Sequence, residues 1–186
     1  NSHLPISQVE PIIKQTAQGI ENRDQISEFV EPPLVKACQI FWDKNIRTLS
    51  SSANRKNVGN NANIILDYDS MSEENKQIAE KYGERFPHAG TEAVDIKIPI
   101  KNETVTVQEV EAQSVEQARR FKKQDPTWIP TYTLAELKQS YGCDPDDDYG
   151  VEDFEAEGYY YSPQENLFYF SKGHYEKAHQ ETDEQE

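Results

Sequence analysis

The stretch VDIKIPI, residues 94–100, carries the clearest secondary-structure pattern in this chain. Apolar residues alternate with polar residues or proline along the whole stretch, so an extended backbone would present one apolar face. This alternation predicts a β-strand with one buried side. Lys101 and Asn102 follow directly and predict a turn, which would bring the chain back as a partner strand over residues 104–110.

A second pair of strands is expected earlier in the chain. Residues 62–69 (ANIILDYD) form an apolar run that ends in polar residues, and residues 46–50 form a shorter run. The connection over residues 51–61 is rich in Ser, Asn and Gly, a composition typical of loops. These two strands therefore predict a long hairpin, in addition to the hairpin over residues 94–110.

The helices are predicted from capping boxes, in which Ser or Thr is followed three residues later by Glu or Gln. Such boxes begin at Ser7, Ser70, Ser114 and Thr133, and a further helix is expected at Glu31, where two prolines suit a first helical turn. Together with the strands, they predict an α+β fold: an antiparallel sheet of two hairpins with helices packed on it. The expected helices span residues 7–20, 31–45, 70–82, 114–124 and 133–141.

Acidic residues are concentrated at the C-terminal end. The chain of 186 residues has a net charge of −15, and residues 142–186 contain 14 Asp and Glu against 2 Lys. The first 141 residues are nearly balanced, with 20 acids and 17 bases. We therefore expect a body over residues 1–141, an acidic region with an aromatic hairpin over 142–178, and a disordered tail over 179–186.

The charge and the cysteines restrict the classes of partner and location. A net negative chain repels nucleic acid and anionic membranes, so neither is an expected partner, and no apolar run approaches the ~20 residues that span a bilayer. A protein partner is expected, with a basic protein as one option, although an acidic surface can also serve solubility alone. Cys38 and Cys143 make neither a disulfide framework nor a metal-binding spacing. These observations favour a soluble cytoplasmic protein, bacterial or translocated, and leave its oligomeric state open.

Asp67 and Asp69 are candidate catalytic residues. They end the apolar run IILDYDS, residues 64–70, and carboxylates at i and i+2 of a strand lie on the same side, where they can share a divalent cation. The run resembles the first motif of haloacid dehalogenase-type phosphotransferases, which implies an α/β core with Asp67 as nucleophile, Asp69 as acid/base and Mg²⁺ as cofactor. The Gly-Thr that usually follows this motif is missing here, and the expected elements do not alternate as in a parallel sheet. In the alternative interpretation a strand simply ends in polar residues before a helix.

A candidate anion-binding loop contains Ser51, Ser52, Asn54 and Arg55, followed by Lys56 and Gly59. Hydroxyls and backbone amides close to bases can hold a phosphate or another small anion. The spacing matches no phosphate-binding loop, however, and loops of Ser, Asn and Gly commonly serve only as connections.

Aromatic residues gather near the C-terminus. Tyr159, Tyr160, Tyr161 and Tyr169 could form a surface on which a peptide or a base stacks. In the alternative interpretation they are faces of a hairpin that pack within their own domain. The largest basic cluster, residues 119–123, predicts a solvated helix face. In the alternative interpretation the acidic C-terminal segment of the same chain folds onto it, in competition with an acidic partner.

The sequence thus favours a non-enzymatic protein-binding or regulatory module that uses the acidic, aromatic-rich C-terminal region and needs no cofactor. The alternative is a small metal-dependent hydrolase or phosphatase in which Asp67 and Asp69 hold Mg²⁺ and carry the reaction.

Overall fold

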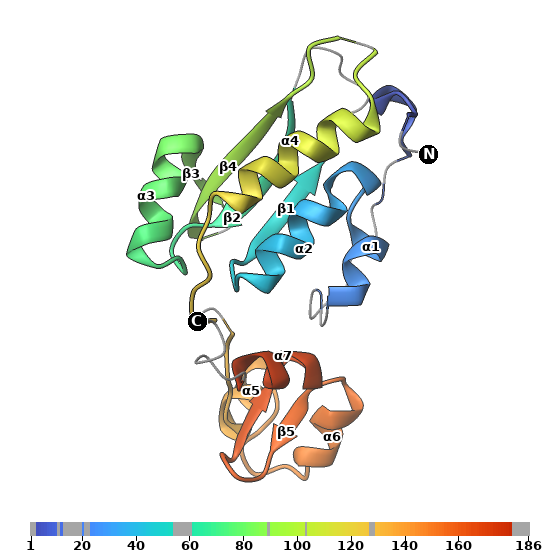
Figure 1. The fold of residues 1–186 in the computed structure, drawn as a ribbon. Helices are drawn as coiled ribbons and strands as arrows, with labels where there is room; N and C mark the ends of the chain where they lie inside the picture. Colours follow the sequence, from blue (N-terminus) through green and yellow to red (C-terminus); the bar gives the residue numbers. More distant parts are fainter. Residues whose placement is uncertain are drawn as a thin grey trace. The chain divides into compact units, whose positions relative to one another are not determined.

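The computed structural model describes residues 3–10, 12, 20, 23–53, 61–88, 90–102, 104–126 and 129–179. The chain forms two compact units (Figure 1): unit 1 comprises residues 1–16 and 23–125, and unit 2 comprises residues 17–22 and 126–186. The division near residue 125 differs from the expected boundary at residue 141, because residues 126–141 belong to unit 2. Most of the tail expected to be disordered, residues 180–186, lies outside the described residues.

Unit 1 contains the antiparallel sheet that the sequence predicts. Its strand order is β1-β2-β4-β3, and each neighbouring pair is antiparallel. The alternating stretch lies in β4, a central strand, where Val94, Ile96 and Ile98 are fully buried. The α+β class and the β1–β2 hairpin are therefore confirmed, and the second hairpin of the sheet is β3–β4. The strands are β1 (Thr48–Ser52), β2 (Asn61–Asp67), β3 (Glu84–His88) and β4 (Thr91–Pro99).

The partner of β4 is not the one expected. Residues 104–110 were predicted as its returning strand, but β3 precedes β4 and pairs with it, from Glu84 opposite Asp95 to His88 opposite Thr91. Pro87 made a strand hard to predict here, because proline has no backbone N–H to donate within a sheet. The residue is tolerated because β3 is an edge strand.

Residues 107–119 form a helix, α4 (Val107–Arg119), instead of the predicted strand and a shorter helix from Ser114. Thr106 caps the helix: its hydroxyl accepts the Glu109 backbone N–H (3.2 Å), and the Glu109 carboxylate accepts the Thr106 N–H (2.9 Å). Ser114, the expected cap, is fully buried in mid-helix and donates to the Glu111 carbonyl oxygen.

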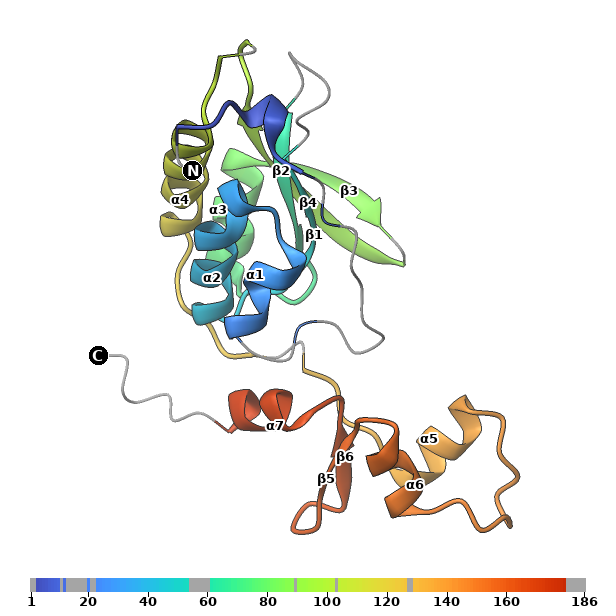
Figure 2. The ribbon, with the colours of Figure 1, turned by 90° about the vertical axis from the view of Figure 1, so that its right-hand side faces the viewer.

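The helices of unit 1 cover one face of the sheet, as Figure 2 shows. Phe41 of α2 packs edge-on against Phe121, just after α4, with ring centroids 5.4 Å apart. The α3 helix is confirmed, although its cap is Ser72 and not Ser70. In the stretch where a helix from Ser7 was expected, Ile6–Gln8 forms one 3-10 turn, and residues 11 and 13–19 lie outside the described part. The other helices are α1 (Ile26–Phe29), α2 (Val35–Asp43) and α3 (Glu73–Tyr82), with 3-10 turns at Arg23–Gln25 and Pro32–Leu34.

Unit 2 is built on the predicted aromatic hairpin. β5 (Tyr160–Ser162) and β6 (Leu167–Tyr169) pair antiparallel, and the backbone of Tyr132 adds two hydrogen bonds to Phe168, of 3.0 and 2.8 Å. The hydrophobic core consists of Leu137, Phe154 and Phe168. Three short helices complete the unit: α5 (Leu134–Ser140), α6 (Val151–Ala156) and α7 (Lys172–Ala178). Across the described parts of both units, every helix is too short or too polar to traverse a bilayer.

Candidate functional site

Unit 2 carries a dense group of exposed carboxylates, which we call the acidic surface. Its residues come from the loop before α6, from α6 itself and from the C-terminal end of that helix, and each of them is exposed. Within residues 126–171 the sequence has a single base, Lys138, so the surface has almost no intervening positive charge. The acidic surface consists of Asp144, Asp146, Asp147, Asp148, Glu152, Asp153, Glu155 and Glu157.

Lys138 of α5 holds the acidic loop from the inside. Its side chain is only 10% exposed, and its Nζ lies 2.9 Å from the Asp147 Oδ1. The same ammonium donates to the carbonyl oxygens of Pro145 (3.2 Å) and Asp147 (3.1 Å). The hydrogen bond from Lys138, followed by the N–H of Tyr149, lowers the pKa of Asp147 below its ordinary value. Lys138 was not identified from the sequence, although its position as the one base in this acidic stretch was a visible indication.

The α6 helix presents its acidic residues outward because its one buried residue points inward. Phe154 is fully buried and lies edge-on to Tyr149 and Tyr141, with centroids 5.1 and 5.2 Å away. The Asp153 carboxylate accepts the Gly150 N–H at 2.7 Å, which satisfies a free donor at the start of the helix. Acidic side chains are also favoured there by the helix dipole. Asp153 therefore has a structural role in addition to its charge.

The predicted aromatic binding residues form part of the packing of unit 2. Tyr159 and Tyr161 pack against the core of Leu137, Phe154 and Phe168 on one side of the hairpin. Burial, followed by the hydrogen bond with the Tyr141 hydroxyl, raises the pKa of Tyr159. These two rings support the acidic surface as internal packing.

The other two predicted aromatic residues lie on the opposite side of the hairpin. Tyr160 and Tyr169 contact Tyr175 of α7, with ring centroids 4.7 and 5.2 Å apart. Tyr169 is buried and donates to Glu165 (2.8 Å); burial, then this carboxylate, raises the pKa of Tyr169 to about 12. A base or peptide could not stack on the Tyr169 ring without displacing α7.

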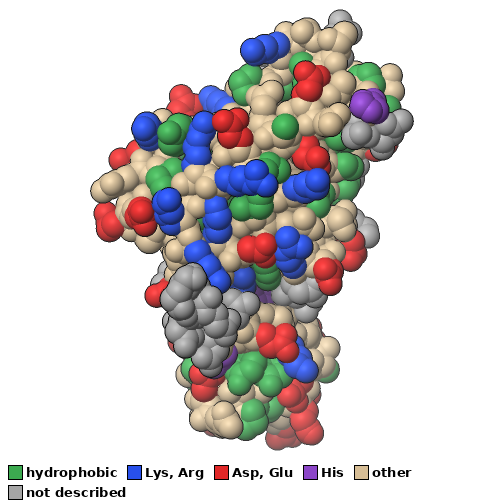
Figure 3. All heavy atoms as spheres, in the orientation of Figure 1, with side chains coloured by type: hydrophobic (Ala, Val, Ile, Leu, Met, Phe, Trp, Pro, Cys, Tyr) green, Lys and Arg blue, Asp and Glu red, His purple; other side chains and the backbone are tan. Residues whose placement is uncertain are grey.

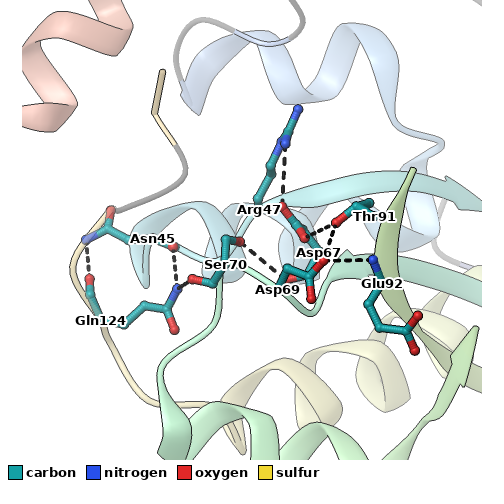
Figure 4. A network of polar contacts seen from close by, with 8 residues as sticks. All are labelled: Asn45, Arg47, Asp67, Asp69, Ser70, Thr91, Glu92 and Gln124. Carbon is teal, nitrogen blue, oxygen red and sulfur yellow. Dashed lines mark hydrogen bonds and ion pairs between the residues drawn. The ribbon is translucent and has the colours of Figure 1, made fainter. Parts of the chain in front are cut away.

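Asp67, the last residue of β2, and Asp69, in the turn that follows, both lie beside the Thr91 hydroxyl (Figure 4). The Thr91 Oγ1 lies 3.1 Å from the Asp67 Oδ1 and 3.0 Å from the Asp69 Oδ2. Because a hydroxyl has one hydrogen, it can donate to only one of the two carboxylates at a time. The Glu92 N–H donates to Asp69 at 3.0 Å, and this bond, followed by Thr91, lowers the pKa of Asp69.

The surroundings of this pair fit a structural lock better than a catalytic centre. The Arg47 guanidinium lies 3.5 Å from the Asp67 Oδ2, and Asp67 is buried. No group of three or more His, Cys, Asp and Glu side chains that could hold a metal ion occurs in the described ranges. The strand before the motif, β2, is antiparallel to both of its neighbours, whereas the phosphotransferase resemblance implies a parallel α/β core.

The predicted anion loop is only partly within the described residues. Ser51 lies in β1, and its hydroxyl hydrogen-bonds the buried Cys38 thiol, whose pKa is raised by burial to about 12 despite this bond. Ser52 is exposed at the end of β1. Asn54 and Arg55 lie outside the described residues.

The acidic surface is thus the candidate site with the most distinctive chemistry, and the carboxylate pair at Thr91 is the second. The first can attract cations and basic protein surfaces. The second fixes the turn between β2 and α3 to the start of β4. The chain matches no family model, no curated protein and no solved structure.

Proposed function

We propose that the protein is an interaction module that binds a basic protein surface through the acidic surface of unit 2. The observation that supports this proposal is the concentration of charge: residues 126–186 contain 15 Asp and Glu against 3 Lys. Residues 1–125 hold 19 acids and 16 bases, so solubility of the whole chain does not require such a local excess. Clustered charge of one sign increases the association rate and the selectivity for a partner of the opposite sign.

The rigidity of the surface also supports binding. Lys138 fixes the loop at residues 144–148 through three contacts, and Phe154 anchors α6 in the core. Carboxylates on a folded framework lose less conformational entropy on binding than carboxylates on a flexible tail. The acidic surface is therefore preorganised for a complementary cationic surface.

The test is a pull-down from cell lysate with the full chain and a neutralised variant, with captured proteins identified by mass spectrometry. The variant removes charge from residues whose side chains make no structural hydrogen bond, and it keeps Asp147 and Asp153, which hold the loop and cap α6. Its substitutions are Asp144→Asn, Asp146→Asn, Asp148→Asn and Glu152→Gln.

A matched control changes the net charge by the same amount in unit 1. Its four positions are exposed acids. We expect a basic partner with the wild type and the control at about 0.1 M salt, and loss of that partner in the neutralised variant and at about 0.5 M salt. Equal capture by all three proteins would contradict the proposal. The control carries Glu10→Gln, Asp24→Asn, Glu74→Gln and Asp125→Asn.

A further inference from the structure

Unit 1 carries a cluster of cations at the end of α4, which we call the basic surface. Arg119, Lys122 and Lys123 are exposed, and Lys44 of the segment after α2 lies beside them. In Figure 3, Lys and Arg side chains gather over the part of unit 1 formed by α2, α3 and α4. The acidic surface of unit 2 carries the opposite charge.

The backbone that carries these cations is held in place by the side-chain amides of Asn75 and Gln124. Asn75 of α3 is fully buried, and it accepts the Lys122 N–H and donates to the Lys122 carbonyl oxygen, both at 2.8 Å. The Gln124 side chain accepts the Ser72 N–H and donates to the Asn45 carbonyl oxygen, at 2.8 and 3.1 Å. The segment after α4 is therefore fixed to two other elements, and its cations project from a rigid support.

The charges of the basic surface are not neutralised by neighbouring carboxylates. Arg120 pairs with Glu116 (3.6 Å), but the part of the chain that the structure describes gives Arg119, Lys122 and Lys123 no carboxylate partner within 4.0 Å. The pKa of Lys44 is lowered, first by burial and then by the like charges of Lys122 and Arg119. The helix dipole stabilises cations in the last turn of a helix. It does not account for Lys122 and Lys123, because both follow the end of α4.

The geometry also indicates which kind of anion fits. A helix C-terminus presents carbonyl oxygens and no free N–H groups, so it cannot cradle a single phosphate as a helix N-terminus does. Lys44 already donates to two of these carbonyls, of Ala118 (3.0 Å) and Phe121 (2.6 Å). What remains is a spread of side-chain cations, which suits several carboxylates distributed over a protein surface better than one compact anion.

We propose that the basic surface of one copy of this chain binds the acidic surface of a second copy. The inference rests on the proposed function, because the acidic surface supplies the occupant. The net charge of −15 repels at long range, but at physiological salt the Debye length of about 8 Å leaves the contacting charges dominant. Since the two contacting surfaces differ, the association is head-to-tail.

Sedimentation velocity of the full chain, over a range of concentrations at about 0.1 M and about 0.5 M salt, tests the proposal. We expect wild-type self-association at the lower salt and its loss at the higher salt. Arg119→Glu with Lys123→Glu should weaken it by on the order of tenfold or more, and so should Asp146→Lys with Asp148→Lys. An equimolar mixture of these two variants should associate again, because each then carries a surface opposite in charge to one on the other.

The matched control is Lys36→Glu with Lys101→Glu, two exposed positions outside the basic surface, which should associate like the wild type. Wild-type protein that stays monomeric, or variants that do not recover on mixing, would overturn the proposal. So would a monomer that binds a single-stranded oligonucleotide through Arg119 and Lys123, since the surface would then serve nucleic acid.

Failure here can be told apart from failure of the proposed function. In the lysate pull-down, Arg119→Glu with Lys123→Glu keeps the acidic surface and should still capture a basic partner. If that capture persists while no self-association is seen, only the second-copy inference fails. If neither occurs, the proposed function fails as well.

Discussion

At the scale of single residues, Lys138 shows how one buried cation can order an acidic loop. Asp147 would be repelled by its acidic neighbours on either side, yet the loop closes around the ammonium of Lys138, whose side chain is only 10% exposed. Buried charges are tolerated when they are paired and hydrogen-bonded, and Lys138 has one carboxylate and two carbonyl oxygens. The residue that gives the acidic surface its shape is thus a base.

Replacing Lys138 with Met should lower the free energy of unfolding of unit 2 by about 2 kcal/mol, because two carbonyls and Asp147 lose their donor. Near-UV circular dichroism is a suitable probe, since eight of the ten tyrosines lie in residues 126–186. Lys36→Met, which removes an exposed cation from unit 1, is the control. An unchanged tyrosine transition in Lys138→Met would show that the loop holds without the ammonium.

The same contact predicts a pH dependence. The folded-state pKa of Asp147 is depressed, so its stabilising contribution is fully present above the ordinary Asp value of about 3.9 and is lost as the pH falls through the lower folded value. Acid titration should therefore weaken unit 2 more in the wild type than in Lys138→Met. Parallel acid titrations of the two proteins would contradict the assignment of the shift to Lys138.

The carboxylate pair at Thr91 leads to a prediction about magnesium. The described residues supply two carboxylates, one of them beside Arg47, so we expect Mg²⁺ to leave the melting temperature of the protein unchanged. A site at tenfold excess over its dissociation constant would add about 1.4 kcal/mol, which a thermal melt detects. A magnesium-dependent rise that Asp67→Asn abolishes, with turnover of a phosphate monoester, would instead support the phosphotransferase alternative.

At the scale of elements, α4 shows how a capping box overrides a strand-like pattern. Residues 104–110 (TVTVQEV) alternate in a way that also suits a strand. Val107, Val110, Ser114 and Ala118 lie three or four residues apart, however, and all are buried on the same helix. The helix begins at Thr106, where the reciprocal bonds with Glu109 satisfy two donors at once.

Thr106→Ala, which removes this cap, should lower the free energy of unfolding of unit 1 by about 1 kcal/mol, measured by denaturant unfolding with Trp42 fluorescence in a Trp128→Phe background. Thr104→Ala, just outside the helix, should have a smaller effect, because its hydroxyl bonds only to the nearby Asn102 side chain. The reverse order of the two effects would mean that the Thr106 box contributes little to the helix.

At the scale of the whole molecule, the chain contains two cores that do not share residues. The core of unit 1 lies between its sheet and helices, and the core of unit 2 surrounds Phe154 and Phe168. The charges are also separated, since the excess of acids belongs almost entirely to unit 2. Each unit can therefore be perturbed by itself.

Phe154→Ala removes a fully buried ring and should cost unit 2 about 3–5 kcal/mol. We expect loss of the tyrosine signal of unit 2 while the amides of β2 and β4 keep their protection against hydrogen exchange. Phe41→Ala should give the opposite pattern, because its ring is buried in unit 1. Simultaneous loss of protection in both units in either variant would show that they unfold as one.

Several elements follow from the sequence because their causes are local. The alternation in β4, the spacing of Leu34, Cys38 and Phe41 in the second helix, and the Thr133 box of α5 all depend on residues within a few positions of one another. Periodicity and capping can be recognised without knowledge of the fold.

The tertiary structure decided the features that depend on distant partners. Whether β4 pairs with residues before or after it depends on pairing energies and on the competing stability of α4, and neither is encoded within one segment. Three other features likewise require chain segments that meet only after folding: the packing of the tyrosines, the contact of the Thr91 hydroxyl with both carboxylates, and the burial of Lys138. The sequence by itself therefore determined the class of fold and the location of the charge, whereas long-range packing decided which of those residues remain at the surface.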